Sequence, residues 1–298
     1  MMKQIWLDWL GKPSDVFEPG LSPVQKTFTL PGCQGELYLQ KNGKDTFQRV
    51  VLLFPENMEK PCPGVVIPFY YPEAMLGMDP FTGEKLPRYS GIAMMLHLAY
   101  RGYAVISADA YHLTYCVSDK DRDDFSRWRD AAEALRNEHP GWTGMGKLTA
   151  DTMLLTDILA ADPRVDAERI GIAGHSLGGK MAFYAGCLDD RIKVILASDF
   201  GIGWDQTNWR DLWYRGTKVE ELQSAGLNHS SLLGCSASKP MCLLAGQYDD
   251  MTSWEMMQAA PGYETCPEKL KIVHHAAGHR PPADALEEGY AFLDQWLK

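Results

Sequence analysis

Long hydrophobic runs are absent from this chain of 298 residues. No stretch approaches the roughly 18 apolar residues that cross a membrane as a helix. The amino-terminal segment MMKQIWLDWLGKPSD is interrupted by Asp8, and no small-residue cleavage site follows it. We therefore expect neither a membrane span nor a secretory signal peptide, and we predict a cytoplasmic protein.

Paired cysteine motifs are also missing. The cysteines are odd in number and contain no C-x-x-C pair, so neither a disulfide framework nor a zinc site is indicated. We expect reduced thiols and no bound metal, with two of the cysteines in apolar runs as core residues. The seven positions are Cys33, Cys62, Cys116, Cys187, Cys235, Cys242 and Cys266, of which Cys187 and Cys242 are the two in apolar runs.

An excess of basic charge is lacking as well. The chain has 29 basic and 39 acidic residues, which gives a net charge of −10. This balance argues against nucleic acid or an anionic membrane as the main partner, but it does not restrict a neutral ester or sugar substrate. The run GIAGHSLGG lacks the first glycine pair of a dinucleotide-binding motif, and no strand near the amino terminus begins such a unit. We therefore expect no cofactor.

What the chain does contain is a series of short apolar runs that alternate with helical patterns. GELYLQ (35–40) and FQRVVLLF (47–54) have period-two character and predict two antiparallel strands joined through KNGKD. The later alternation predicts crossover connections and a mostly parallel sheet with helices on both faces, an α/β fold. We expect further strands at 64–70, 103–109, 169–174, 192–198, 240–246 and 269–275, and helices at 90–101, 150–162, 177–188 and 283–298.

The stretch GHSLG lies between an expected strand, RIGIAG, and an expected helix that starts at Leu177. A serine on a sharp strand-to-helix turn is typical of a nucleophile elbow, in which small residues on both sides avoid collisions with neighbouring chain. Gly174 and Gly178 fill these two positions. The helix amino terminus would favour an oxyanion that forms beside Ser176. The alternative is a tight turn with a bystander serine.

A serine nucleophile needs a base to take its proton and an acid to orient that base. Asp249 and Asp250 follow the expected strand at 240–246, and His279 follows the last strand in a loop rich in Gly and Pro. In an open parallel sheet, catalytic groups gather at this carboxyl edge of the strands. Asp250 and Asp199, which follows an earlier strand, are alternatives to Asp249. His274 and His275 are expected to be structural histidines satisfied by backbone carbonyls. His275 and His279 are four positions apart, but no third ligand nearby indicates a zinc site.

Three segments, GHSLGG, LLAGQYD and AAGHRPP, resemble the catalytic segments of the α/β-hydrolase superfamily. The chain is most similar to the dienelactone-hydrolase-like and acetyl-xylan-esterase-like branch, and the resemblance covers most of residues 60–298. It implies an α/β-hydrolase fold and a serine carboxylesterase, with Ser176 as nucleophile, Asp249 as acid and His279 as base. It also implies a short acyl group, with an acetylated carbohydrate as the most specific expectation.

The expected oxyanion hole departs from the superfamily pattern. One donor should be the N–H of Leu177, and the other should come from the loop after the third strand. Many relatives have His-Gly or Gly-Gly in that loop, whereas this chain has PFYYPEAM. The alignment puts Tyr71 at the donor position with Tyr70 next to it, because Pro72 has no N–H to donate.

Substrate contacts are expected from loops at the same edge of the sheet. Residues 72–90, 112–149 and 201–216 exceed a minimal fold. We assign substrate binding to four residues. The tryptophan rings would suit a sugar or an aromatic ester, and a tyrosine side chain could form a wall of the acyl pocket. As an alternative, the tryptophans only attach their segment to the body of the protein. The four are Tyr70, Trp204, Trp209 and His175.

The length suits a single domain over residues 1–298, with residues 1–60 as an amino-terminal extension carrying the first antiparallel strands. Residues 112–149 and 200–235 are then inserted or cap segments. Two other functions compete with the esterase: a serine peptidase of prolyl-oligopeptidase type and a non-catalytic binding protein on a hydrolase fold. We expect a small ester as the partner, no nucleic acid and no membrane. Two roles are open for the IWLDWL segment: packing on its own chain, or packing on a partner chain in a homo-oligomer.

Overall fold

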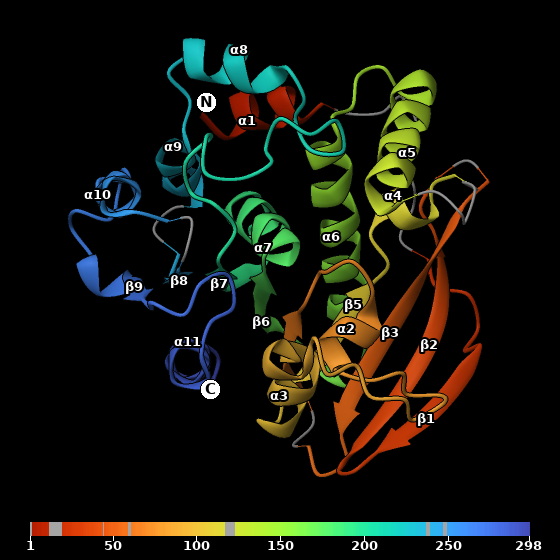
Figure 1. The fold of residues 1–298 in the computed structure, drawn as a ribbon. Coiled ribbons are helices and arrows are strands. Elements are labelled where there is room, and N and C mark those ends of the chain that lie inside the picture. Colours follow the sequence, from red (N-terminus) through yellow and green to blue (C-terminus); the bar gives the residue numbers. More distant parts are fainter. Residues whose placement is uncertain are drawn as a thin grey trace.

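A nine-stranded sheet forms the centre of this computed structural model (Figure 1). The structure describes residues 2–11, 20–43, 45–58, 61–116, 123–236, 239–246 and 249–298. The strand order is β1-β2-β3-β5-β4-β6-β7-β8-β9. The strands are β1 Lys26–Leu30, β2 Cys33–Lys41, β3 Phe47–Pro55, β4 Cys62–Val66, β5 Ala104–Ala108, β6 Val165–His175, β7 Ile192–Ser198, β8 Met241–Ala245 and β9 Leu270–His274.

Antiparallel and parallel pairing divide the sheet as the sequence predicts. The first three strands and β5 pair antiparallel, and from β5 through β4 to β9 every pair is parallel. The parallel strands β4, β5 and β8 are buried at every position, which explains their uninterrupted apolar runs. The α/β fold expected from the alternation is therefore confirmed. Lys44, in the KNGKD connection, lies outside the described residues.

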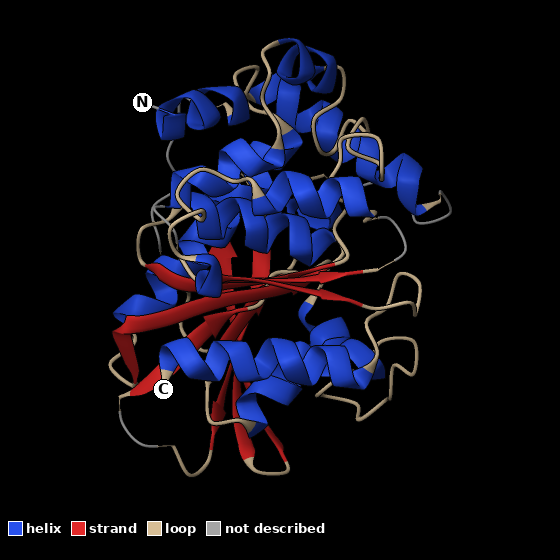
Figure 2. Ribbon diagram, turned by 90° about the vertical axis from the view of Figure 1, so that its left-hand side faces the viewer, coloured by secondary structure: helices blue, strands red, loops and turns tan. Residues whose placement is uncertain are grey.

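Helices cover both faces of this sheet (Figure 2). One apolar cluster joins α1, α5, α6, α7 and α9 to one face, and a second joins α2, α3 and α11 to the other. The helices are α1 Met2–Leu10, α2 Pro72–Leu76, α3 Met94–Tyr100, α4 Tyr111–Thr114, α5 Asp124–Glu138, α6 Gly144–Ala161, α7 Leu177–Leu188, α8 Lys218–Ser224, α9 His229–Leu233, α10 Met251–Gln258 and α11 Ala283–Leu297, with 3-10 turns at Ser90–Ile92, Gly234–Ser236 and Pro267–Lys269.

Two predicted elements are reproduced residue for residue. The helix at 177–188 and the strand at 192–198 match α7 and β7. The other expected elements differ in their bounds. Strand β6 begins four residues before the expected strand at 169–174, and the helix expected at 90–101 is divided into a 3-10 turn and α3. The strand expected at 64–70 ends at Val66, and the helix expected at 150–162 begins six residues earlier, where the Thr143 side chain accepts from the Gly146 N–H as its cap.

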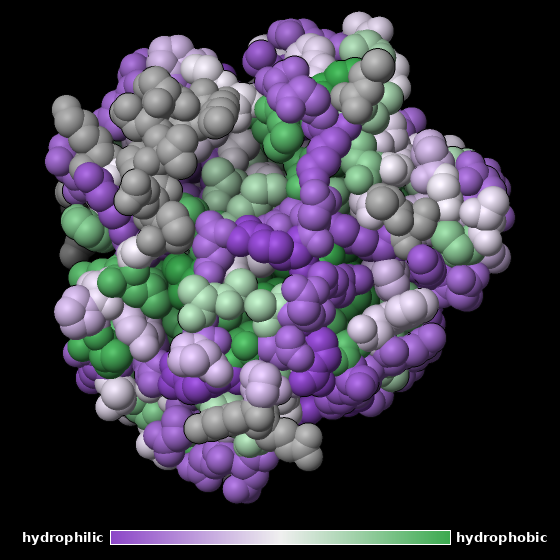
Figure 3. All heavy atoms as spheres, turned by 180° about the vertical axis from the view of Figure 1, so that it is seen from behind, coloured by the Kyte–Doolittle hydropathy of each residue, from purple (hydrophilic) through white to green (hydrophobic). Residues whose placement is uncertain are grey.

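The molecular surface is mixed in character. Figure 3 shows the face behind that of Figure 1, where hydrophilic side chains run across the middle between apolar patches. None of the helices in the described part of the chain is long and apolar enough to cross a membrane.

Candidate active site

Ser176 occupies a sharp turn between β6 and α7. Its backbone angles are φ 56° and ψ −116°, a region that side-chain-bearing residues rarely adopt. A Cβ on Gly174 would lie 2.1 Å from the Gly178 carbonyl oxygen, and one on Gly178 would lie 2.1 Å from the Pro68 carbonyl oxygen. The two glycines are therefore required by close backbone approach, and together they allow the strained turn that presents the Ser176 hydroxyl at the sheet edge.

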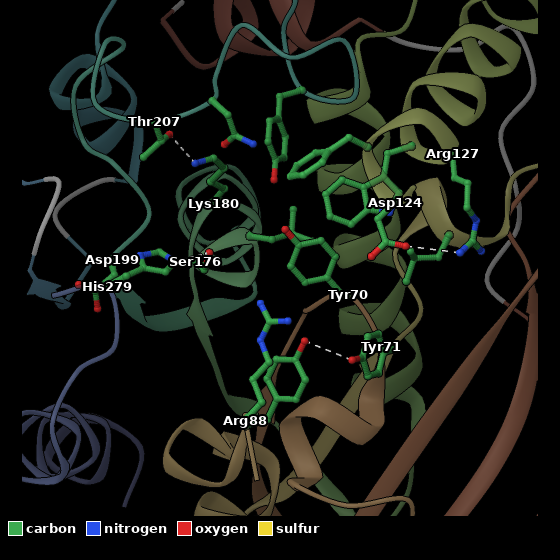
Figure 4. Close-up of a pocket in the computed structure, with 17 residues that line it drawn as sticks. Tyr70, Tyr71, Arg88, Asp124, Arg127, Ser176, Lys180, Asp199, Thr207 and His279 are labelled. Atoms are coloured by element: carbon green, nitrogen blue, oxygen red, sulfur yellow. Dashed lines mark hydrogen bonds and ion pairs between the residues drawn. The ribbon is translucent and has the colours of Figure 1, made fainter. Parts of the chain in front are cut away.

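The loop between β9 and α11 brings His279 to this serine. His279 Nε2 lies 2.9 Å from Ser176 Oγ, across 103 positions of the sequence (Figure 4). Burial lowers the pKa of His279, and the nearby positive charges of Lys180 and Arg280 lower it further. A neutral imidazole at hydrogen-bond distance from a hydroxyl can accept its proton.

Two buried carboxyl groups lie close to this pair. Asp199 follows β7 with a positive φ of 49°, and it lines the same cavity as Ser176 and His279. Its Oδ2 accepts from Ser198 Oγ at 2.6 Å, and its Oδ1 lies 3.1 Å from His275 Nε2. Burial is the main reason that the pKa of Asp199 is raised to about 8.

Asp249 follows β8, and its Oδ1 accepts from the Ile202 N–H at 2.6 Å. Burial raises the pKa of Asp249 to about 6, and the Ile202 hydrogen bond and Lys180 oppose that rise. Asp249 lines a neighbouring cavity of about 630 Å³. The two residues between Gly246 and Asp249 in the G-x-x-D spacing lie outside the described residues. Both carboxyl groups thus remain available for the acid role.

Asp250, the third acid considered from the sequence, has a structural role instead. It is the N-cap of α10, where its Oδ1 accepts from the Ser253 N–H at 3.0 Å. A capping aspartate stabilises a helix start and needs no catalytic explanation.

The two histidines at the end of β9 are held differently from the expectation. His275 is buried against Asp199, whose carboxylate replaces the expected backbone carbonyl, and His274 packs on Trp254 with ring centroids 4.3 Å apart. Among the residues that the structure describes, no group of three His, Cys, Asp or Glu side chains is placed to hold a metal ion.

The predicted oxyanion donors face the same space as the serine. Leu177, Tyr70 and Tyr71 all line the cavity that contains Ser176. Leu177 is the first residue of α7, so its N–H points out of the helical hydrogen-bond ladder. Tyr71 is the N-cap of α2 with Pro72 next, and its hydroxyl lies 3.2 Å from that of Tyr89. The bulky pair is thus compatible with an extended backbone at the donor position.

The cavity around Ser176 has a volume of about 690 Å³ and two unlike walls. One wall is aromatic: Tyr70 stacks on Trp128 with centroids 5.1 Å apart, and Phe125 meets the Trp128 edge at 5.2 Å. The opposite wall carries polar groups of Lys180 and of Thr207 and Asn208. A cavity of this size can enclose a ring-sized ligand.

Only one of the four predicted substrate contacts lines this cavity. Tyr70 does, whereas Trp204 and Trp209 are buried in the core around His229. His175 is buried behind the site, with Nδ1 3.0 Å from Ser198 Oγ. Thr207, Asn208 and Tyr214 of the 201–216 segment line the cavity, whereas the tryptophans of that segment are buried in the core.

Two residues of the cavity wall were not predicted from the sequence, because neither lies in a recognisable motif. Trp128 comes from α5, within the inserted or cap segment expected at 112–149. Lys180 lies one helical turn after Ser176 on α7, and that i+4 spacing is the signal that could have found it. Its buried ammonium group donates to the Phe200 carbonyl at 2.6 Å and to Thr207 Oγ1 at 2.8 Å, and burial lowers the pKa of Lys180 to about 7.

Known structures share this architecture. "Glucuronoyl Esterase from Solibacter usitatus" superposes with a TM-score of 0.73 at 15% identity, over 100% of this chain and 91% of its own. An acetyl xylan esterase from Paenibacillus sp. R4 gives a TM-score of 0.60 at 16% identity, over 99% and 94%. The chain thus shares its fold with these esterases, as the sequence predicts.

Sequence comparisons find two further similarities. A family model described as "Glucuronyl esterase, fungi" matches residues 151–232, which include the elbow and Lys180. The protein named "Putative hydrolase YtaP" from Bacillus subtilis (strain 168) is 26% identical over 267 residues, which are 82% of this chain and 81% of its own. The superfamily resemblance predicted from GHSLGG and the later segments is thus confirmed.

Proposed function

We propose that this α/β-hydrolase is a serine carboxylic-ester hydrolase that acts on esters of carbohydrates. The observation that carries the proposal is the 2.9 Å contact between Ser176 Oγ and His279 Nε2 on a strained elbow at the sheet edge. The comparisons support the choice of ester, because the matching family model and both superposed structures are named as carbohydrate-active esterases.

The chemistry follows from the positions of these groups. His279 takes the Ser176 proton while the hydroxyl attacks the ester carbonyl. The N–H groups of Leu177 and Tyr71 are the proposed donors to the tetrahedral oxyanion. His279 then protonates the leaving alcohol, and a water molecule repeats the sequence on the acyl-enzyme. No step requires a metal or cofactor.

The acid that orients His279 is proposed from two positions. The G-x-x-D spacing assigns Asp249, and the cavity that Asp199 shares with Ser176 and His279 assigns Asp199. Changing the true acid to Asn should reduce kcat by about 10⁴-fold, because the imidazole loses the tautomer it needs. Kinetics of Asp199→Asn and Asp249→Asn, each with circular dichroism as a folding check, separate the two. An equal and small loss in both would exclude a triad.

The proposal as a whole is tested with Ser176→Ala. Native protein and variant are compared at equal folded concentration on 4-nitrophenyl acetate, on acetylated xylan and on a methyl ester of glucuronic acid. We expect the variant to lose about 10⁴-fold or more of kcat/KM on the accepted ester. Equal rates in both proteins would contradict a serine mechanism. The preferred ester decides between acetyl groups, as the sequence resemblance implies, and a uronic-acid ester.

If the native protein hydrolyses no ester, the result would favour one of the two competing functions. A peptidase would cleave short proline-containing peptides in a Ser176-dependent manner. A binding protein would show ligand affinity with no turnover at all.

A further inference from the structure

The cavity around Ser176 is lined by three basic side chains, although the chain as a whole carries a net charge of −10. Two of the three have partners of their own. Lys180 donates to Phe200 and Thr207, and Arg127 pairs with Asp124 at 3.4 Å. The third is Arg88, and no carboxylate in the described part of the chain forms an ion pair with it.

Arg88 is aimed at the reaction site. Figure 4 shows its side chain rising from the loop after α2 towards the space between Ser176 and Tyr70. Its guanidinium carbon lies 5.6 Å from the centre of the Tyr89 ring. A guanidinium over an aromatic face keeps its N–H groups available at its edge.

The backbone on both sides of this arginine is held in place. The next residue, Tyr89, has its hydroxyl 3.2 Å from that of Tyr71, the proposed oxyanion donor. The carbonyl of Arg88 itself accepts from the guanidinium of Arg280, which directly follows His279. The loop that contains Arg88 is therefore attached to the segment of Tyr71 and to the segment of His279. These two contacts fix the position of the Arg88 backbone relative to the site.

We propose that Arg88 binds a free carboxylate of the substrate, separate from the ester that Ser176 attacks, so that the enzyme acts on esters of acidic carbohydrates. A guanidinium presents paired N–H donors that match the two oxygens of a carboxylate, which an ammonium group cannot do. This inference rests on the proposed function and names its substrate class. Negatively charged chains would otherwise be repelled by a protein of this net charge, so a local cation is needed beside the ester.

Turnover of two matched substrate pairs tests the assignment. In the first pair the acyl half is charged or neutral: mono-4-nitrophenyl glutarate and its methyl ester. In the second pair the alcohol half differs: 4-carboxyphenyl acetate and its methyl ester. We expect the native enzyme to prefer the charged member of at least one pair. Arg88→Gln should reduce that preference by about 10- to 100-fold and leave the neutral member unchanged.

Two further variants make the result specific. Arg88→Lys keeps the charge but loses the paired donors, and it should retain only part of the preference. Arg129→Gln removes the same charge from α5 outside the cavity lining, and it should leave the preference intact. The proposal is overturned if native enzyme shows no preference for either acid, if Arg88→Gln lowers both members of a pair equally, or if Arg129→Gln has the same effect.

A binding measurement keeps this inference separate from the esterase proposal. Trigalacturonate and its methyl-esterified form are titrated calorimetrically into Ser176→Ala protein, with and without Arg88→Gln. We expect Ser176→Ala to bind the acid form more tightly than the methyl-esterified form, and we expect this difference to disappear when Arg88→Gln is added. That result would support the role of Arg88 even if no ester is turned over. If the native protein shows no Ser176-dependent turnover of any ester but the preference for the acid form is observed in the titrations, only the esterase proposal is refuted. Equal binding of both forms by Ser176→Ala would refute the role of Arg88.

Discussion

Single side chains at the carboxyl edge set the protonation states that the proposed chemistry needs. His279 must be neutral to take the serine proton, and burial together with Lys180 and Arg280 lowers its pKa below the usual 6.5. The same buried environment raises the pKa of Asp199 to about 8 and of Asp249 to about 6. Burial thus disfavours the charged form of each of these groups, which suits the base but opposes the ionised carboxylate that the acid role needs.

The pH dependence of turnover follows from this lowering. Deprotonation of His279 activates the enzyme, so kcat/KM should rise with pH and reach its plateau below the pH at which an exposed histidine would. The rising limb should have a midpoint under 6.5 when kcat/KM is measured from pH 4.5 to 8.5 on a substrate without ionisable groups. A midpoint above 6.5 would mean that an ion pair, and not burial, dominates around the imidazole.

Tryptophans in the core and in the cavity should respond to mutation in opposite ways. Trp209 is fully buried and donates to the Gly201 carbonyl at 2.8 Å, so Trp209→Phe should lower the free energy of unfolding by about 1–3 kcal/mol and leave KM unchanged. Trp128→Ala should instead raise KM about 10-fold, because it removes the ring that stacks on Tyr70 in the cavity wall.

Denaturant unfolding and initial-rate kinetics on the same two variants distinguish these effects. A rise in KM for Trp209→Phe would restore the substrate role that the sequence assigned to that segment.

The elbow illustrates how one element depends on a neighbouring one. Gly178 lies in the first turn of α7, and the Pro68 carbonyl that a Cβ would strike belongs to the segment between β4 and α2. That segment continues to Tyr70 and Tyr71. Helix α7 and the proposed oxyanion donor are therefore positioned by a single close contact.

Gly178→Ala should disturb both elements at once. We expect a loss of about 1–3 kcal/mol in unfolding free energy from overpacking. The displaced donor should in addition lower kcat/KM by about 10²-fold. Gly91→Ala is the matched control, because nothing lies within 4 Å of its added methyl group. A Gly178→Ala enzyme with native stability and activity would show that the segment at Pro68 moves freely.

On the scale of the whole molecule, the amino-terminal helix completes one of the two apolar layers. Trp6 of α1 is fully buried, with its ring centroid 6.1 Å from that of Tyr184 and 6.5 Å from that of Trp204. These rings lie on α7 and on the segment after β7. The IWLDWL segment thus packs on its own chain, which is one of the two roles that the sequence left open for it.

Trp6→Ala should therefore destabilise the entire fold. We expect a loss of about 3–5 kcal/mol in unfolding free energy, measured by urea denaturation, because a large buried ring leaves a cavity. Met2→Ala, at a position 43% exposed on the same helix, should change stability by less than about 0.5 kcal/mol. Equal effects of the two changes would mean that α1 does not belong to the folded core.

Several features could be predicted from the sequence because they depend on local pattern. The apolar runs predict the strands and their mostly parallel arrangement. The GHSLG spacing predicts the elbow, and the place of His279 in the loop after the last strand predicts that it lies at the same sheet edge as Ser176. The cytoplasmic location, the single-domain division, the cap segments and the oligomeric state stay predictions.

Other features were decided only by the tertiary structure. Whether a tryptophan fills the core or faces the cavity depends on how its segment folds back, and Trp204 and Trp209 follow no local pattern that reveals it. Trp128 and Arg88 reach Ser176 from segments distant in the sequence. Ser176 and His279 could be predicted from the sequence because strand ends place them. The cavity walls and the contact of Asp199 with His275 depend on the packing of distant segments, which no local spacing encodes.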